Sequence, residues 1–204
     1  MICTHAANAE PQMVTVTVGS IPYGVVYDRA KGEVFVTNAD SNTVSVISDS
    51  NNTVVATIQV GASPHDVAYD HVKGEVFVTN EKSNTVSVIS DRTNTVVGTI
   101  PVGGYPFAIA CDPQASELFV TGANSTVSVI SDKTDTVVAS VNVGKIPFGA
   151  VYDSQKGELF VTTHNSNTVS VLNFSPTVPE FPLAIPILCI GIVSMLFFCR
   201  VRFL

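Results

Sequence analysis

Two histidines and their acidic neighbours are the side chains in this sequence best suited to bind a metal ion. His65 and Asp66 lie in the loop that enters the first strand of a repeated sheet. Glu81 and His164 lie in the loops between the second and third strands of their sheets. In a ring of four repeated sheets, these two kinds of turn open on the same face, and the second and fourth sheets stand opposite each other. Imidazole and carboxylate groups suit zinc or iron. A metal site built from His65, Asp66 and His164 is therefore one hypothesis.

An aromatic collar is the alternative that the sequence favours at this place. The chain consists of repeats, and the residue equivalent to His65 is aromatic in every other repeat: Tyr23, Phe107 and Phe148. Metal ligands would be residues that stand out from the other repeats, whereas a ring occurs at this position in all four repeats. We therefore expect the four side chains to surround the mouth of a central channel as a collar. We expect no metal, no cofactor and no catalytic residue.

The cysteines predict neither a disulfide framework nor a metal-binding motif. The sequence has four of them, Cys3, Cys111, Cys189 and Cys199, and no C-x-x-C pair. Cys111 occupies a position that is tyrosine in the other three repeats, so we interpret it as a small core residue and not as a nucleophile. No Ser/His/Asp order, glycine-rich phosphate loop or spaced pair of carboxylates recurs along the chain.

One repeated module organises these side chains. A Val-Gly pair marks each joint, and the glycines Gly19, Gly61, Gly103 and Gly144 are separated by 42, 42 and 41 residues. A period of this length is typical of propeller blades. The repeats cover residues 19–60, 61–102, 103–143 and 144–174.

Each repeat contains short runs with the character of strands, four in each of the first three. In the first repeat they are residues 23–27, 33–37, 43–48 and 53–60, which are rich in Val, Ile, Thr and aromatic residues and alternate with a period of two. Gly32 and clusters of Asn and Asp favour tight turns between them, so each repeat is predicted to form an antiparallel meander. The third repeat has Ser116 where the others have glycine. Because a Cβ atom costs about 1 kcal/mol in a left-handed conformation, we expect that hairpin to differ.

Apolar or small residues on both faces of each sheet predict that the sheets stack. Val44 and Val46 lie on one face of their strand, and Ser45 and Ile47 lie on the other. A sheet of this kind must be packed on both sides, as propeller blades are. The sequence therefore predicts an all-β fold, a β-propeller over residues 12–174 with four blades of four antiparallel strands.

The segment 12–18 is predicted to close the ring. Its sequence, QMVTVTV, matches the last strand of a repeat, and the fourth repeat stops after its third strand. A last blade that takes one strand from the front of the chain and three from the back leaves no open edge. The rival interpretation is that residues 12–18 are the remnant of a preceding repeat in a longer protein.

Composition and charge exclude one class of partner. Of the 204 residues, 46% are hydrophobic and 13% are charged, which is enough for one core and a more apolar segment besides. The formal net charge is -7. Because nucleic-acid binding needs a basic face, we expect no nucleic-acid partner.

The repeats resemble the YVTN repeat of archaeal surface-layer-type proteins. The signature stands here as Phe-Val-Thr-Asn at residues 35–38 and 77–80, as Phe-Val-Thr-Gly at 119–122 and as Phe-Val-Thr-Thr at 160–163. Together with the recurring SNTVSVI, the resemblance covers Val18 to about Asn173. It implies a β-propeller on the cell surface. Relatives commonly build seven blades, so the resemblance leaves the number of blades open.

The C-terminal region predicts a membrane anchor. A Pro-rich linker covers residues 175–182, and residues 183–199 are apolar and followed by a basic tail, residues 200–204. With Phe181 and Pro182, the run has 19 uncharged residues. As a helix it would span about 28 Å, close to the thickness of the hydrocarbon layer. Arg200 and Arg202 favour a cytoplasmic tail, which would place the propeller outside the cell.

The tripeptide Pro179-Glu180-Phe181 lies just before this apolar run and resembles the PEF-CTERM sorting motif of archaeal surface proteins. The resemblance implies recognition by an archaeosortase-type processing enzyme. The plainer interpretation is a single-pass anchor. Both place the propeller at the cell surface.

Features near the N-terminus and in the turns also fit a surface protein. Residues 1–11 contain Ala-Asn-Ala, which is either the tail of a secretory signal or simply a frayed terminus. Three sequons permit glycosylation, at Asn51, Asn124 and Asn173.

Two hypotheses about function follow. The first is a non-enzymatic cell-surface propeller that serves as a binding, adhesion or envelope-structural module, with other surface proteins or glycans as partners. The second is an extracytoplasmic propeller enzyme, lactonase-like or dependent on a metal or redox group at the channel mouth. Uniform repeats without a singular cluster favour the first.

Overall fold

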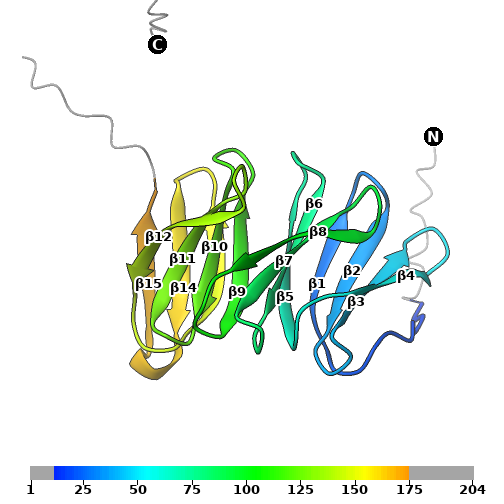
Figure 1. Ribbon diagram of the computed structural model, residues 1–204, viewed down its shortest axis with the longest axis horizontal. Coiled ribbons are helices and arrows are strands. Elements are labelled where there is room, and N and C mark those ends of the chain that lie inside the picture. The colour runs from blue at the N-terminus through cyan, green and yellow to red at the C-terminus, as the bar shows by residue number, and fades with distance from the viewer. Residues whose placement is uncertain (1–11, 175–204) are drawn as a thin grey trace, which may run out of the picture.

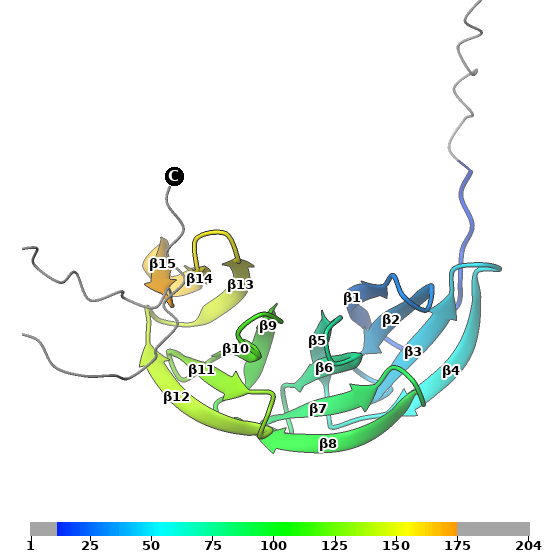
Figure 2. The same cartoon turned by 90° about the horizontal axis from the view of Figure 1, so that it is seen from above.

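Four antiparallel sheets, arranged side by side in an arc, make up the part of the protein that the structure describes (Figures 1 and 2). The computed structural model describes residues 12–174. We call the sheets blades 1 to 4. Blade 1 consists of β1 (Pro22–Asp28), β2 (Glu33–Asn38), β3 (Thr43–Ser48) and β4 (Thr53–Gln59), and blade 2 of β5 (Pro64–Asp70), β6 (Glu75–Asn80), β7 (Thr85–Ser90) and β8 (Thr95–Pro101). Blade 3 consists of β9 (Pro106–Asp112), β10 (Glu117–Gly122), β11 (Thr126–Ser131) and β12 (Thr136–Asn142). Blade 4 consists of β13 (Pro147–Asp153), β14 (Glu158–Thr163) and β15 (Thr168–Asn173), with a short 3-10 helix, η1 (His164–Ser166), between the last two.

Each blade is a meander in which strands that follow one another in sequence also pair. The first strand of each blade, β1, β5, β9 or β13, lies on the inside of the arc, and β4, β8 and β12 lie on its outer rim (Figure 2). The predicted repeats, strands and meander order are therefore confirmed for the described residues.

The hairpin in blade 3 contradicts one prediction. Ser116 takes a φ of 59°, close to the 67° of Gly32, and Glu117 pairs with Asp112 as Glu33 pairs with Asp28. The expectation of a different hairpin was wrong. Pairing along β9 and β10 holds the register, and the serine accepts the left-handed conformation at a cost of about 1 kcal/mol.

The core consists of three apolar layers, one at each joint between blades. At each joint, a phenylalanine from the second strand of one blade contacts the next blade, and Phe35, Phe77 and Phe119 have no exposed surface. Valines on β3, β7 and β11 lie beside these rings in the same layers. Because the sheets join face to face, the apolar residues on both faces of blades 2 and 3 are buried, as the sequence pattern requires.

The predicted closure of a four-blade ring is wrong. Among the residues that the structure describes, blade 4 has three strands, and residues 12–18 form no strand. The Met13 side chain is 91% exposed, and Val169 and Val171 on β15 are each 54% exposed. The cause is curvature, because four blades span only part of a circle and the first and fourth sheets remain apart (Figure 2). Residues 12–18 lead into β1 and lie at the end of the arc opposite β15.

Several predictions concern residues outside the described range. They are the signal remnant or frayed terminus at residues 1–11, the linker at 175–182 with its motif Pro179-Glu180-Phe181, the membrane segment at 183–199 and the tail at 200–204, and these stay predictions. Within residues 12–174, the structure has no helix with the length and apolarity needed to cross a membrane.

Candidate functional site

A β-bulge near the start of each inner strand positions the four collar residues. The ladder between β5 and β6 shifts register between Pro64 and Val67, and the corresponding shift occurs in the other three blades. Each bulge therefore contains the collar residue of its blade. Bulges re-aim side chains at the ends of strands, which accounts for the presentation of these residues at the inside of the arc.

The structure brings the four collar residues together. The rings of Tyr23 and His65 stack with their centroids 4.7 Å apart. His65 also meets Phe107 and Phe148 edge-on, at 5.6 Å and 5.7 Å, and these two phenylalanines lie 5.1 Å from each other. One residue from each blade thus contributes to a continuous aromatic cluster. The Tyr23 side chain is 60% exposed and that of Phe148 is 46% exposed, so the cluster also offers surface to a ligand.

A row of threonines holds the collar in place, and the sequence analysis missed it. Thr79 Oγ1 accepts a hydrogen bond from the bulge amide of Asp66 at 2.9 Å and donates one to the Phe107 carbonyl of the next blade at 2.7 Å. Thr37 and Thr121 donate in the same way to the carbonyls of His65 and Phe148. Each bond joins one blade to the collar residue of the next. The signal was present in the sequence, because this threonine is the third residue of the repeated Phe-Val-Thr motif.

Asparagine, the fourth residue of that motif, has a different role. Asn80 Nδ2 donates hydrogen bonds to Thr85 Oγ1 at 3.2 Å and Ser87 Oγ at 2.9 Å, and Asn38 makes the equivalent pair of bonds in blade 1. The side chain thereby ties the second strand to the third beneath the collar. The motif therefore combines a core aromatic residue, a joint between blades and a brace within one blade.

The residues of the metal hypothesis do not come together as a ligand set. The Asp66 carboxylate accepts hydrogen bonds from the amides of Val67 and Ile109, at 2.9 Å and 3.0 Å. The His164 ring lies in η1 and contacts Asn165 at 3.0 Å. Residues 12–174 contain no group of three or more His, Cys, Asp or Glu side chains placed to hold a metal ion. Asp66 instead stabilises the bulge and the neighbouring blade.

Cys111 is partly buried at the joint of blades 2 and 3, near the buried carboxylates of Asp70 and Asp132. Burial, and then the charges of Asp70 and Asp132, raise the pKa of the thiol, so the thiolate is disfavoured at neutral pH. A nucleophile needs the opposite shift. The geometry agrees with a core role for this residue.

The charged form of Asp132, a carboxylate near Cys111, is disfavoured by its surroundings. In blade 2 the equivalent tyrosine, Tyr69, donates its hydroxyl to Asp91 at 2.9 Å. Cys111 has no hydroxyl to donate in the same way, and neither carboxylate oxygen of Asp132 accepts a hydrogen bond of ordinary geometry from the described residues. Burial, followed by the neighbouring Asp70, raises the pKa of Asp132 to about 6.

The three sequons that permit glycosylation lie on the surface. Asn51, Asn124 and Asn173 are all exposed. In the first two sequons the threonine hydroxyl donates to the asparagine side-chain oxygen, at 2.8 Å in each case. Glycosylation stays a prediction.

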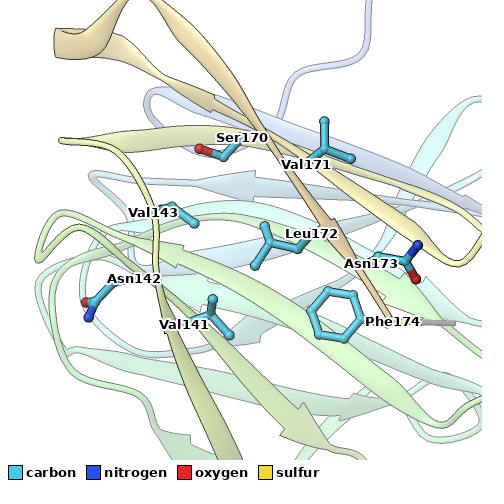
Figure 3. Close-up of a pocket in the computed structure, with 8 residues that line it drawn as sticks. All are labelled: Val141, Asn142, Val143, Ser170, Val171, Leu172, Asn173 and Phe174. Carbon is cyan, nitrogen blue, oxygen red and sulfur yellow. The ribbon is translucent and has the colours of Figure 1, made fainter. Parts of the chain in front are cut away.

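A groove on the outer side of blade 4 is a second feature that the sequence analysis missed. Leu172 and Phe174 lie across from Val141 and Val143 of blade 3, and the space between them is about 560 Å³ (Figure 3). The groove borders β15, which pairs with β14 on one edge and, within residues 12–174, with no strand on the other.

Comparison with known proteins identifies the fold. The family model described as YNCE-like beta-propeller matches residues 7–177. The chain is similar in structure to Kuenenia stuttgartiensis hydrazine synthase, with a TM-score of 0.71 and 18% identity over 81% of this chain and 49% of that one. It is also similar to a functionally unknown protein from Desulfotomaculum acetoxidans DSM 771, with a TM-score of 0.63 and 16% identity over 74% of this chain and 55% of that one. A search of curated proteins finds no match. The chain spans about half the length of these two solved chains, and at such identities the likeness shows the fold alone.

Proposed function

The chain belongs to the YNCE-like β-propeller family, and on this premise we propose that it is a non-enzymatic binding module of the cell surface. The aromatic collar is the binding face. This proposal rests on one observation: four blades contribute one ring each to a cluster whose ends, Tyr23 and Phe148, are 60% and 46% exposed. Exposed aromatic rings held on a rigid scaffold give a large contact area at a low cost in conformational entropy.

The support beneath the collar favours binding over mere packing. Each collar residue lies in a bulge, and the threonines of blades 1 to 3 bond the next collar residue through its carbonyl. The backbone that carries the rings is thus fixed by hydrogen bonds between blades. A preorganised surface of this kind loses little freedom when a ligand docks. Surface proteins and glycans of the cell envelope are the proposed partners.

The surface location is part of the same proposal. It is supported by the apolar segment 183–199 with its basic tail and by the Pro179-Glu180-Phe181 motif, which together suit a membrane anchor or an archaeosortase substrate. Protease treatment of intact cells tests it. We expect the propeller to be digested from outside, and full protection in sealed cells would contradict the proposal.

Binding is tested with cell envelopes from which the lipids have been extracted, so that insertion of the apolar segment does not contribute. We expect the full chain, kept in detergent, to sediment with the envelopes. The double variant Tyr23→Ala, Phe148→Ala should weaken this binding at least tenfold, because it removes the two exposed rings of the collar. Val138→Ala is the matched control, since Val138 is 56% exposed on the outer strand β12. Equal binding by the double variant and the control would refute the collar as the binding face.

An extracytoplasmic enzyme is the second candidate, and one observation favours it. His65 Nδ1 is buried and has no hydrogen-bond partner among the described residues, although the ring lies at the centre of the collar. Such a nitrogen is available to a ligand. Elemental analysis of the purified chain distinguishes the candidates. We expect no stoichiometric metal, and a bound metal that is lost in His65→Ala would favour the enzyme instead.

A further inference from the structure

The two ends of the arc expose faces that are buried at every internal joint. Val67 of blade 2 and Ile109 of blade 3 face the preceding blade and are each 6% exposed, whereas the equivalent Val25 of blade 1 is 66% exposed. At the other end, Val44, Val86 and Val127 face the following blade and are fully buried, whereas the equivalent Val169 of blade 4 is 54% exposed. The free face of blade 1 is here called the leading face, and that of blade 4 the trailing face.

These faces are complementary, as the three joints within the chain demonstrate. At each joint the trailing face of one blade packs on the leading face of the next with the same residue positions. The leading face presents Val25, Tyr27, Val34, Val36 and Ile47, and the trailing face presents Val151, Phe160, Val169 and Val171. A fourth joint would therefore need no new chemistry.

The collar provides a second, independent sign that the free face of blade 4 can accept another blade. At the internal joints, the threonine of the Phe-Val-Thr motif donates to the carbonyl of the next collar residue. In blade 4 this residue is Thr162, which is exposed and bonds only within its own blade among the described residues. Beside it, a hollow of about 330 Å³ is lined in part by Phe148, His164 and Val169. This is where a following collar residue would lie, and Tyr23 is the collar residue of a first blade.

The unpaired edge of β15 provides the third sign. Blades 1 to 3 each end in a fourth strand on the outer rim, and the described part of the chain gives blade 4 none. The groove between β12 and β15 leaves Leu172 and Phe174 partly uncovered beside this edge (Figure 3). Residues 12–18 have the sequence of a fourth strand and lie at the leading end. An unpaired strand edge is a template for adding another strand.

We propose that two copies of this chain join head to tail into one closed propeller of eight blades. The trailing face of each copy packs on the leading face of the other, and residues 12–18 of each copy pair with β15 of the other. Such a contact joins two different faces and therefore closes only if the curvature allows it. Propellers typically have four to eight blades, so two arcs of four reach the upper end of this range and three arcs exceed it. The proposal does not depend on what the collar binds.

The internal joints fix the geometry of the new one. In blade 1, Ser45 pairs with Thr57 and Thr43 with Gln59. By equivalence, Ser170 of one copy pairs with Thr15 of the other. Thr162 Oγ1 donates to the Tyr23 carbonyl across the same joint, which completes the series of threonine bonds.

The mass of the full chain in detergent, measured by sedimentation equilibrium, tests the assembly. We expect two chains per particle. Val25→Lys on the leading face and Val169→Lys on the trailing face should each raise the dissociation constant of the pair at least a hundredfold, because each buries a charge at both joints. Both side chains are exposed in one copy, so at concentrations where the parent is also a single chain neither variant should lower the melting temperature. Val72→Lys is the matched control, since Val72 is 61% exposed in a turn away from both faces, and it should leave the mass unchanged.

Cross-linking shows which chain supplies the strand. The double variant Thr15→Cys, Ser170→Cys places two thiols at a pair whose equivalents lie directly opposite each other, a geometry that a disulfide can bridge. After oxidation, a non-reducing gel should show a disulfide-linked dimer that the parent chain and each single variant lack. A cross-link within one chain would overturn the proposal, because the strand would then close its own ring. A single-chain mass at every concentration, or an open series of masses above two chains, would also overturn it.

Discussion

Replacing Phe77 with alanine is expected to lower the free energy of unfolding by about 3–5 kcal/mol. The ring has no exposed surface and lies in the apolar layer between blades 2 and 3, with Leu118 and Ile130 on the opposite side. Removing it costs the transfer energy of the ring and leaves a cavity that two hydrogen-bonded sheets cannot collapse around. Urea unfolding of the full chain in detergent, followed by circular dichroism, measures the loss.

Phe160 offers a matched control for this prediction, because it occupies the same repeat position in blade 4. Its side chain is only partly buried, since no blade follows it. At low chain concentration, where the end faces are unoccupied, Phe160→Ala should cost about 1 kcal/mol. Equal losses for the two variants would show that the joint between blades is not what stabilises the ring at position 77.

Lowering the pH from 7.5 to 5 is expected to stabilise the joint between blades 2 and 3 by about 1 kcal/mol. Burial and the nearby Asp70 raise the pKa of Asp132 from 3.8 to about 6. The folded chain therefore binds a proton between about pH 4 and pH 6 that the unfolded chain has already lost. The stabilisation is fully present below the unfolded pKa and is lost as the pH rises through the folded one.

Asp132→Asn isolates this effect from the other titrating groups. The amide carries no charge, so the variant should be about 3 kcal/mol more stable than the parent chain at pH 7.5 and should differ little from it at pH 4. Asp91→Asn is the control at the equivalent position of blade 2, where the carboxylate accepts the Tyr69 hydroxyl, and it should not stabilise the chain. Denaturant unfolding at several pH values measures the difference in stability between Asp132→Asn and the parent chain. If this difference is as large at pH 5 as at pH 7.5, the assignment is refuted.

The repeated module could be predicted from the sequence because its signals are local. Strands such as Thr43–Ser48 alternate in type with a period of two, and the turns between them contain asparagines that take positive φ, among them Asn42 and Asn52. The collar could also be predicted, since four equivalent positions carry rings. Each of these signals can be read from one repeat alone or by aligning the repeats with one another.

Curvature and hydrogen bonding between blades could not be predicted in the same way. Whether residues 12–18 reach β15 depends on the angle between successive sheets, which arises from the packing of Phe35, Phe77 and Phe119 and is not written in any one strand. The function of Thr79 likewise depends on a carbonyl 28 residues away. The prediction for the hairpin at Ser116 was wrong for the opposite reason, because it gave the conformational preference of one residue more weight than the pairing of two strands.

The uniformity of the three internal joints bears on how such a chain changes over generations. Each joint uses the same positions on either side, so a duplication or deletion of one module would create a junction already compatible with its neighbours. Recombination between near-identical segments could thus lengthen or shorten the protein without any compensating substitution. The contacts between modules therefore do not by themselves fix how many modules the protein has.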